Sequence, residues 1–161
     1  MSVVLIGFMG AGKSTIARTL DRENFIDLDQ IIEKGIGMPI LQFFSDYGEA
    51  KFRQIEREAL EAAVLSGFNV ATGGGIVQLA ENRDCLKKLQ NVVYLKSDFE
   101  TLYERILADK KNRRPLALQP KQDVERLFVQ REKFYEEVAD IIIETKDKKP
   151  EEIIKEIQEL K

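Results

Sequence analysis

The part of this sequence that most constrains the fold is a glycine-rich segment near its start. It reads Gly7-Phe8-Met9-Gly10-Ala11-Gly12-Lys13-Ser14, follows the apolar run 3–6 and precedes the amphipathic segment 13–20. Its glycines permit backbone conformations in which consecutive N–H groups point inward at a helix N-terminus, where they bind an anion. The segment therefore predicts a strand, a phosphate-binding loop and a helix in that order, the arrangement of a P-loop.

Along the rest of the chain, short apolar segments typical of strands alternate with longer amphipathic segments typical of helices. The predicted strands are 2–6, 25–28, 69–72, 92–95 and 141–144. The predicted helices are 13–20, 30–34, 39–66 with a break at Gly48, 79–89, 98–108, 123–138 and 151–160. Several strands are too uniformly apolar to have an exposed face. We therefore predict an α/β fold, a three-layer α/β/α sandwich around a five-stranded parallel sheet, as in P-loop NTPases and nucleoside monophosphate kinases.

No feature of the sequence divides the chain into parts. Its 161 residues contain no internal repeat, low-complexity tract or Ser/Gly-rich linker, so we predict a single domain over 1–161. The apolar start lacks basic residues and is too short for a membrane span. With a single cysteine, no export signal and a net charge of −3, we expect a cytoplasmic protein whose partners are neither nucleic acid nor membranes.

The residue types that are missing narrow the chemistry. The chain contains no histidine, so no histidine can act as a catalytic base or as a metal ligand. Its one cysteine, Cys85, cannot form an intramolecular disulfide. Any catalysis must therefore use carboxylates, lysine, arginine, hydroxyl groups or the backbone.

Positive charge is concentrated in residues 105–133, which hold nine basic and four acidic side chains. This local charge of +5 leaves −8 for the remainder of a chain whose total is −3. Because 110–120 contains Pro115 and Pro120 and has little helical periodicity, we predict an exposed loop that acts as a mobile lid over about 108–120. The alternative is a charged loop that is only solvated.

Two side chains of the glycine-rich segment suit a nucleotide. Lys13 supplies a positive charge for the β- and γ-phosphates, and Ser14 supplies a hydroxyl ligand for Mg²⁺. The preceding strand and the following helix favour nucleoside triphosphate binding over an incidental glycine-rich turn.

Two aspartates, Asp27 and Asp29, stand at the end of the second predicted strand. Strand alternation places them on one face and Ile26 and Leu28 on the other. Near the P-loop, one carboxylate could bind the metal, directly or through water, and the other could accept or orient an acceptor hydroxyl. Because the chain lacks histidine, Asp29 is the leading candidate base. The alternative is that Asp29 only caps the helix predicted to begin at Gln30.

Arg131 interrupts the apolar stripe of the predicted helix 123–138. It lies seven residues after Val124 and three after Phe128, where an apolar side chain is expected. Burying a guanidinium is costly unless an anion meets it, so we predict that Arg131 binds a carboxylate or phosphate of a ligand. The alternative is that its side chain snorkels along the flank of the helix.

Two further groups admit a structural and a functional interpretation. Arg53 and Glu56 lie beside the apolar stripe of 39–66, where periodicity alone favours an ordinary surface ion pair. The glycines Gly73, Gly74 and Gly75 directly follow the third predicted strand. They would allow a ligand to approach the backbone closely, and a merely flexible loop is the alternative.

Taken together, these residues resemble the shikimate kinase family, which belongs to the P-loop kinases of small metabolites. The matching motifs occur in order from residue 7 to residue 150: 7–15, Asp27 with Asp29, Phe52-Arg53-x-x-Glu56, Gly73-Gly74-Gly75, Arg114-Pro115-Leu116, Arg131 within 130–135, and a late loop ending at Pro150. The resemblance implies transfer of the ATP γ-phosphate to the 3-hydroxyl of shikimate, giving shikimate 3-phosphate and ADP, in aromatic amino-acid biosynthesis. It also implies a Mg²⁺-dependent enzyme, which we expect to be a monomer.

The resemblance further implies a role for each site residue. The ATP-binding residues would be Gly10, Ala11, Gly12, Lys13, Ser14, Thr15, Arg114 and Lys149, the last within a stretch, 145–150, that flanks adenine. The shikimate-binding residues would be Asp29, Arg53, Gly73, Gly74, Gly75 and Arg131, with a substrate-binding helical region over about 29–62 and with Phe44 and Phe52 as pocket walls. The Mg²⁺ ligands would be Ser14 and, through water, Asp27. The catalytic residues would be Asp29, Lys13 and Arg114.

Three features depart from the usual pattern of the family. The segment before Phe25 is short, which suggests a truncated first helix. Arg113 stands beside Arg114, so either could contact the phosphates, and Lys149 is expected to act through its backbone. Two other functions stay open on the residues alone: a P-loop kinase acting on gluconate or a nucleoside monophosphate, and an ATP-binding regulator without kinase activity.

Overall fold

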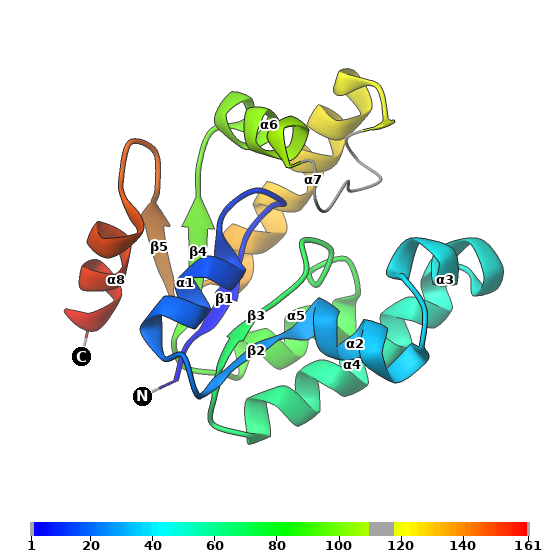
Figure 1. Cartoon of the computed structure of the whole chain (residues 1–161), viewed down its shortest axis with the longest axis horizontal. Helices are drawn as coiled ribbons and strands as arrows, with labels where there is room; N and C mark the ends of the chain where they lie inside the picture. Colours follow the sequence, from blue (N-terminus) through cyan, green and yellow to red (C-terminus); the bar gives the residue numbers. More distant parts are fainter. Residues whose placement is uncertain (1, 110–117, 161) are drawn as a thin grey trace.

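The computed structural model describes residues 2–109 and 118–160 of the chain. Within this part, one sheet contains five parallel strands in the order β2-β3-β1-β4-β5 (Figure 1). The strands are β1 (Val4–Ile6), β2 (Phe25–Asp27), β3 (Asn69–Ala71), β4 (Val92–Lys96) and β5 (Ile141–Glu144). The predicted five-stranded parallel sheet is therefore confirmed.

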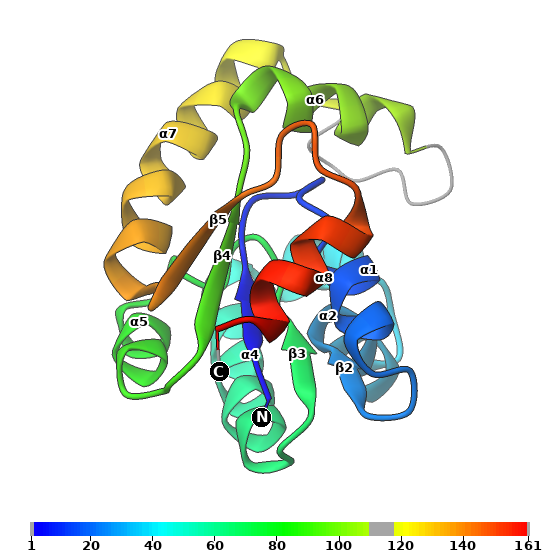
Figure 2. The ribbon, with the colours of Figure 1, turned by 90° about the vertical axis from the view of Figure 1, so that its left-hand side faces the viewer.

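Helices cover both faces of this sheet. They are α1 (Lys13–Leu20), α2 (Leu28–Ile36), α3 (Ile40–Tyr47), α4 (Glu49–Leu65), α5 (Ala80–Lys87), α6 (Phe99–Ala108), α7 (Lys121–Val138) and α8 (Pro150–Gln158). In Figure 2, α1 and α8 lie on one side of the strands and α5 and α7 on the other. The predicted three-layer sandwich is confirmed, and Gly48 separates α3 from α4 at the predicted break.

The order of the strands brings three distant segments to one edge of the sheet. β1 lies between β3 and β4, so the strand order reverses beside it. In sheets of this kind, ligands bind at the carboxyl edge near the reversal. The P-loop leaves β1 at this edge, Asp27 ends β2 there, and the three glycines follow β3 there. The fully buried side chains of Leu5 and Ile6 anchor β1 in the core beneath the P-loop.

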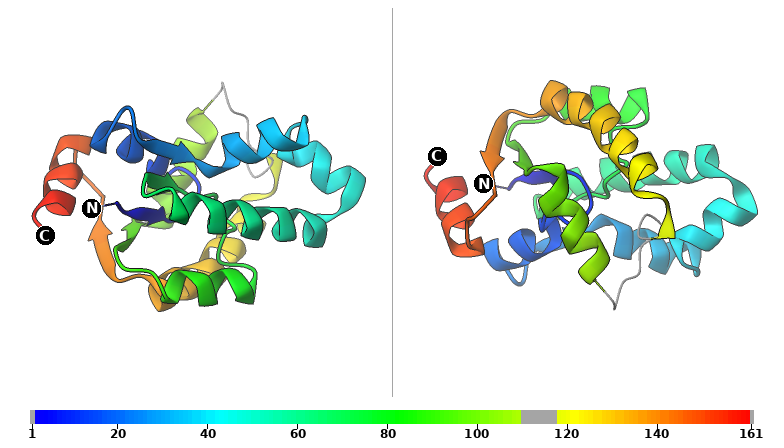
Figure 3. Two further views of the ribbon diagram at one scale, coloured as in Figure 1. Left: turned by 90° about the horizontal axis from the view of Figure 1, so that it is seen from below. Right: turned by 90° about the horizontal axis from the view of Figure 1, so that it is seen from above.

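The helices between β2 and β3 form a unit beside this edge. α4 packs against α2 and α3, and α3 extends away from the sheet (Figure 3). Phe52 links α4 to α3, because its ring lies edge-on to those of Phe43 and Phe44 of α3, with centroids 6.3 and 4.9 Å apart. These helices include the region 29–62 in which the resemblance places substrate-binding residues.

The junction between β2 and α2 differs from the prediction. The strand ends at Asp27 and the helix begins at Leu28, two residues earlier than expected. The N-cap is Asp27, whose Oδ1 accepts a hydrogen bond from the backbone N–H of Gln30 at 3.3 Å. The alternative that Asp29 caps this helix is wrong. The prediction that strand alternation places Asp29 on one face with Asp27 is wrong as well, because Asp29 is already helical. A carboxylate at the N-cap satisfies an N–H group that has no acceptor within the helix, which explains the early start.

Candidate active site

The P-loop connects β1 to α1 as predicted. Gly12, the N-cap residue of α1, has a φ of 90°, a left-handed conformation that glycine adopts without the usual steric penalty. The N–H groups in the first turn of a helix lack acceptors within it and can bind an anion. Lys13 is only 9% exposed, and its Nζ donates hydrogen bonds to the carbonyl oxygens of Gly7 and, at 3.1 Å, of Phe8. Amide donors and a lysine charge are therefore gathered at the carboxyl end of β1.

Ser14 and Asp27, the predicted Mg²⁺ ligands, are in direct contact. Ser14 Oγ donates a hydrogen bond to Asp27 Oδ2 at 2.6 Å, between α1 and the end of β2. Hydroxyl and carboxylate oxygens suit Mg²⁺, which usually keeps several waters and phosphate oxygens and needs few protein ligands. The donor set therefore fits this ion. In residues 2–109 and 118–160, no group of three or more aspartate, glutamate or cysteine side chains offers a different metal site.

Asp29 lies in the first turn of α2, against Gly73. A methyl group built on Gly73 would lie 2.6 Å from Oδ1 and 3.0 Å from Oδ2 of Asp29. Those separations are too short for a side chain larger than hydrogen, so glycine allows the carboxylate to approach the loop backbone. The structure thus places the candidate base beside the segment that follows β3.

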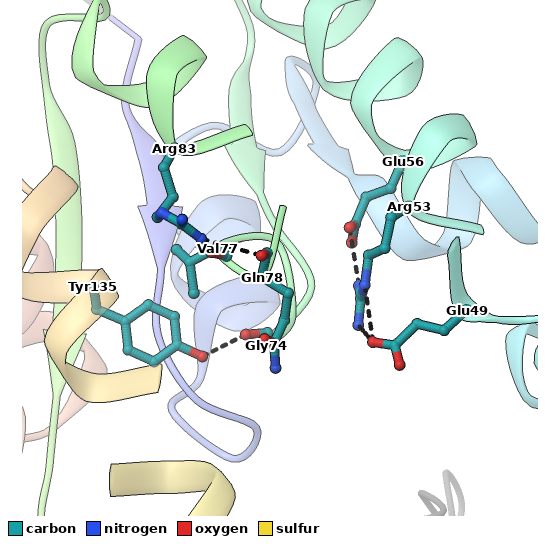
Figure 4. Close-up of polar contacts among 8 residues, drawn as sticks. All are labelled: Glu49, Arg53, Glu56, Gly74, Val77, Gln78, Arg83 and Tyr135. Atoms are coloured by element: carbon teal, nitrogen blue, oxygen red, sulfur yellow. Dashed lines mark hydrogen bonds and ion pairs between the residues drawn. The ribbon is translucent and has the colours of Figure 1, made fainter. Parts of the chain in front are cut away.

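Arg53 and Glu56 form a buried ion pair, so the prediction of a surface pair is wrong. The exposed fractions of the two residues are 8% and 1%. Arg53 Nη1 donates to Glu56 Oε1 at 2.9 Å, and Nη2 donates to Glu49 Oε1 at 3.1 Å (Figure 4). Periodicity did not reveal the burial, because the other polar residues of α4 are mostly exposed and only Arg53 and Glu56 are buried, where Arg53 lies against the loop after β3. A methyl group on Gly75 of that loop would lie 2.7 Å from Cζ of Arg53.

Burial also changes the ionisation of Glu56. Desolvation raises the pKa of Glu56 to about 7, although the neighbouring charge of Arg53 acts in the opposite direction. The charge of this carboxyl group therefore changes near neutral pH, directly beside Arg53.

The rings of Phe44 and Phe52 flank Arg53. Their centroids lie 5.6 and 5.3 Å from Arg53 Cζ, within the range of cation–π attraction. The two predicted pocket walls, Phe44 and Phe52, thus lie beside Arg53, a predicted substrate-binding residue.

Arg131 lies on the buried side of α7, with an exposed fraction of 6%, so the alternative that its side chain snorkels along the flank of the helix is wrong. It shares this side with Val124, Phe128 and Tyr135. Its Nη1 is buried and has no hydrogen-bond partner among the residues that the structure describes. Burial lowers the pKa of the guanidinium, which reflects the cost of keeping this charge away from water. A carboxylate of a ligand would satisfy both the charge and the unused donor.

The three glycines after β3 bring these side chains together. Gly73 meets Asp29, Gly75 meets Arg53, and a methyl group on Gly74 would lie 3.5 Å from Nη1 of Arg131. All three glycines are buried, which argues against a loop that is merely flexible and exposed. One acid and two arginines from α2, α4 and α7 therefore meet along three consecutive residues.

The family of the chain follows from its similarity to known proteins. A family model described as shikimate kinase matches residues 9–161. The chain belongs to the shikimate kinase family. The shikimate kinase of Lactococcus lactis subsp. lactis is 52% identical over 159 residues, which cover 99% of this chain and 97% of the relative. That of Enterococcus faecalis is 45% identical, with 99% and 98% covered.

A solved structure supports the same assignment. Shikimate kinase from Acinetobacter baumannii in complex with shikimate matches with a TM-score of 0.90 and 35% identity, over 99% of this chain and 91% of that one. Shikimate kinases are ATP-dependent phosphotransferases that act on a hydroxyl of shikimate, generally with Mg²⁺. Among the described residues of this family member, no helix has both the length and the apolar character needed to cross a membrane.

Two of the predicted ATP-binding residues, Arg114 and Lys149, lie away from the P-loop in sequence. Arg114 lies outside the described residues, as do Arg113 and most of the predicted lid. Lys149 is the N-cap residue of α8, in the loop that leaves β5 at the carboxyl edge of the sheet. Its carbonyl oxygen accepts hydrogen bonds from the N–H groups of Glu152 and Ile153 at 3.0 and 3.3 Å.

Sequence reasoning missed several side chains that contact the predicted site residues. Tyr135, one turn after Arg131, is fully buried and donates its hydroxyl hydrogen to the carbonyl oxygen of Gly74 (Figure 4). Gln78 lies beside Arg131, and Arg83 binds the backbone of the same loop. In the sequence Tyr135 is one more member of an apolar stripe, and neither Gln78 nor Arg83 belongs to a motif, so no local signal identified them.

Proposed function

We propose that this member of the shikimate kinase family transfers the γ-phosphate of ATP to the 3-hydroxyl of shikimate, giving shikimate 3-phosphate and ADP. Family membership supports the reaction class. The observation that carries the choice of acceptor is the convergence of Asp29, Arg131 and Arg53 on three consecutive glycines. Two cations and one hydrogen-bond acceptor suit a small molecule that carries one carboxylate and several hydroxyl groups.

On the acceptor side, Arg53 and Arg131 would bind the carboxylate of shikimate, and Asp29 would accept a hydrogen bond from the reacting hydroxyl. Phosphoryl transfer depends mainly on positioning and on stabilisation of charge, so the orienting role of Asp29 matters more than its basicity. Phe44 and Phe52 would form walls of the pocket, within the helical region 29–62.

On the donor side, the backbone of 10–15 would bind the phosphates of ATP. Lys13 and Arg114 would stabilise the negative charge of the transferring group. Mg²⁺, held by Ser14 and through water by Asp27, would neutralise charge on the phosphate oxygens. The loop with Lys149 would flank adenine, and a lid over about 108–120 would exclude water and so limit hydrolysis of ATP.

Asp29, Arg53 and Arg131 already meet along the glycines 73–75 of a single chain, which supports our proposal that a monomer is active. We further propose that it acts in the cytoplasm, where ATP is available, with small molecules as its substrates and neither nucleic acid nor membrane as a partner. Size-exclusion chromatography with light scattering, with and without substrates, tests the monomer.

The test of the function is release of ADP from Mg-ATP with shikimate, gluconate or CMP added in turn. We expect acceleration by shikimate alone. Acceleration by gluconate or CMP instead would identify a different metabolite kinase, and ATP binding without acceleration by any of the three would favour a regulator. A Lys13→Ala variant, which removes the phosphate-binding charge, serves as the control for contaminating kinases.

A further inference from the structure

Gln78, three residues after the glycines 73–75, contacts the guanidinium of Arg131. With the amide oxygen facing the arginine, Oε1 accepts from Nε at 2.9 Å and from Nη2 at 3.3 Å. The opposite orientation would direct the NH₂ donors of the amide at the N–H donors of the arginine, so the oxygen faces the guanidinium. One neutral acceptor therefore occupies the Nε side of this buried cation.

The opposite side of the same guanidinium has unused donors. Nη1 of Arg131 is buried and has no hydrogen-bond partner in the described part of the chain. It lies next to Gly74, in the middle of the segment that also meets Asp29 and Arg53. An arginine offers five N–H donors in a rigid plane, so fixing the Nε side also fixes the direction of the other end. That end can bind a carboxylate through Nη1 and Nη2.

The neutrality of Gln78 matters as much as its position. A carboxylate at this place would form a buried ion pair with Arg131 and would use the charge that a ligand requires. An amide accepts the same hydrogen bonds and leaves the net positive charge in place. Arg53, by contrast, is paired with Glu56 and Glu49, so the charge of Arg131 is the less compensated of the two.

Arg83 fixes the backbone from which Gln78 extends. Its Nη1 donates to the carbonyl oxygens of Val77 at 2.6 Å and Gln78 at 3.1 Å (Figure 4). The same guanidinium lies over the ring of Phe134, with Cζ 4.1 Å from the centroid, and its Nε is 3.7 Å from Oε2 of Glu137. Both of these residues belong to α7, the helix that carries Arg131. Arg83 thus links the loop to α7 close to the contact between Gln78 and Arg131.

We propose that Gln78 is a positioning residue that directs the Nη1 end of Arg131 toward the carboxylate of the substrate, and that Arg83 holds Gln78 in place for this task. The inference rests on the proposed function, because it assumes that the anion bound by Arg131 is the carboxylate of shikimate.

The test compares Gln78→Ala and Gln78→Glu with the wild-type enzyme in steady-state assays of ADP release. Loss of a hydrogen bond to a charged group corresponds to a change in binding of about tenfold or more. We expect the KM for shikimate to rise about tenfold in Gln78→Ala and further in Gln78→Glu, with the KM for ATP unchanged. Gln130→Glu is the matched control, because it makes the same change one residue from Arg131 on the exposed side of α7. It should leave both KM values unchanged.

The double variants with Arg131→Ala separate positioning from a general structural effect. If Gln78 acts through Arg131, Gln78→Ala should add less than about twofold to the KM for shikimate once Arg131 is gone. Arg83→Met, which keeps the length of the side chain but not its donors, should act in the same direction as Gln78→Ala. Thermal unfolding of every variant identifies any that fails to fold. If Arg83→Met does not fold, Gln78→Ala and Gln78→Glu alone provide the test.

The outcomes separate the inference from the function on which it rests. If wild-type protein does not phosphorylate shikimate, or if Arg131→Ala leaves the affinity for shikimate unchanged, the proposed function or its carboxylate site is wrong. If both behave as proposed but the Gln78 variants match the wild type, or act equally with and without Arg131, the positioning role of Gln78 is wrong.

Discussion

The substitution Gly75→Ala should separate substrate binding from folding. Its methyl group would lie 2.7 Å from both Cζ and Nη1 of Arg53, where ordinary contact begins at about 3.4 Å. Nη2 of Arg53 is closer still, so the guanidinium must move by about 1 Å. The backbone of Gly75 is not in the left-handed region, so alanine introduces no strain of its own. The clash falls on a side chain and not on the backbone, so we expect the variant to fold, with a melting temperature lowered by about 10 °C because the buried pair of Arg53 with Glu56 is disturbed.

The effect on the reaction should be much larger. Glu56 and Glu49 hold the guanidinium of Arg53 in one place, so its displacement disturbs both ion pairs and the substrate site together. A misplacement of about 1 Å in a positioning group can reduce the rate about 100-fold. We expect kcat/KM for shikimate to fall by about this factor, with the KM for ATP within twofold of the wild-type value because the P-loop is untouched.

The assay measures ADP release as a function of shikimate concentration at saturating Mg-ATP. Gly74→Ala is the matched control, because its methyl group would meet its nearest neighbours at 3.5 Å, an ordinary contact. It should reduce kcat/KM by no more than about fivefold. Equal losses in the two variants, or wild-type kinetics in Gly75→Ala, would refute the steric reasoning.

Three further substitutions test the site at other points. The pKa of Glu56 is raised to about 7, and the negative charge of a bound carboxylate would raise it further. Shikimate should therefore bind more tightly when Glu56 is protonated, and its affinity should fall as the pH rises through 7. Calorimetric titrations at pH 6 and 8 should show this dependence in the wild type but not in Glu56→Gln. Tyr135→Phe leaves the carbonyl of Gly74 without its donor and should lower the free energy of unfolding by about 1 to 3 kcal/mol in urea denaturation. Asp27→Asn keeps an oxygen that can cap α2 but removes the charge beside Ser14. The Mg²⁺ concentration for half-maximal activity should therefore rise about tenfold. An unchanged Mg²⁺ requirement would contradict the assignment of Asp27 to the Mg²⁺ site.

The sequence predicted the sheet well because each strand is marked locally. A buried parallel strand is a short apolar run, and the loops and helices that separate such runs are equally visible. The break at Gly48 was predictable because a glycine within a helical pattern is a local signal for an interruption. The start of α2 was not, because a capping carboxylate and the end of a strand compete for the same residue, and the contact of Asp27 with Gln30 decided in favour of the helix.

The candidate site was predictable in its members but not in its contacts. The position of Arg131 in an apolar stripe predicted a buried cation, because helical periodicity can be recognised from the local sequence alone. The burial of Arg53 with Glu56 was hidden, because it depends on what α4 faces and not on the pattern of α4 itself. Tyr135 and Gly74 are 61 residues apart in sequence, and nothing near either of them signals that they meet.

The arrangement of the site implies that the two substrates can be perturbed separately. Asp29, Arg53 and Arg131 come from three different helices, and what fixes their mutual geometry is the single segment 73–75 that each of them contacts. Pairing of β3 with β1 and β2 anchors the start of this segment, and Arg83 anchors its continuation toward α5. One contact of this segment with the P-loop is at Met9, whose atoms would lie 3.5 Å from a methyl group built on Gly74. Changes on the β3 side should therefore act mainly on shikimate binding and changes in 10–15 mainly on ATP. Substitutions where the two sides touch should affect both, as at Arg131, whose guanidinium lies over the ring of Phe8, or with a larger side chain at Gly74 beside Met9.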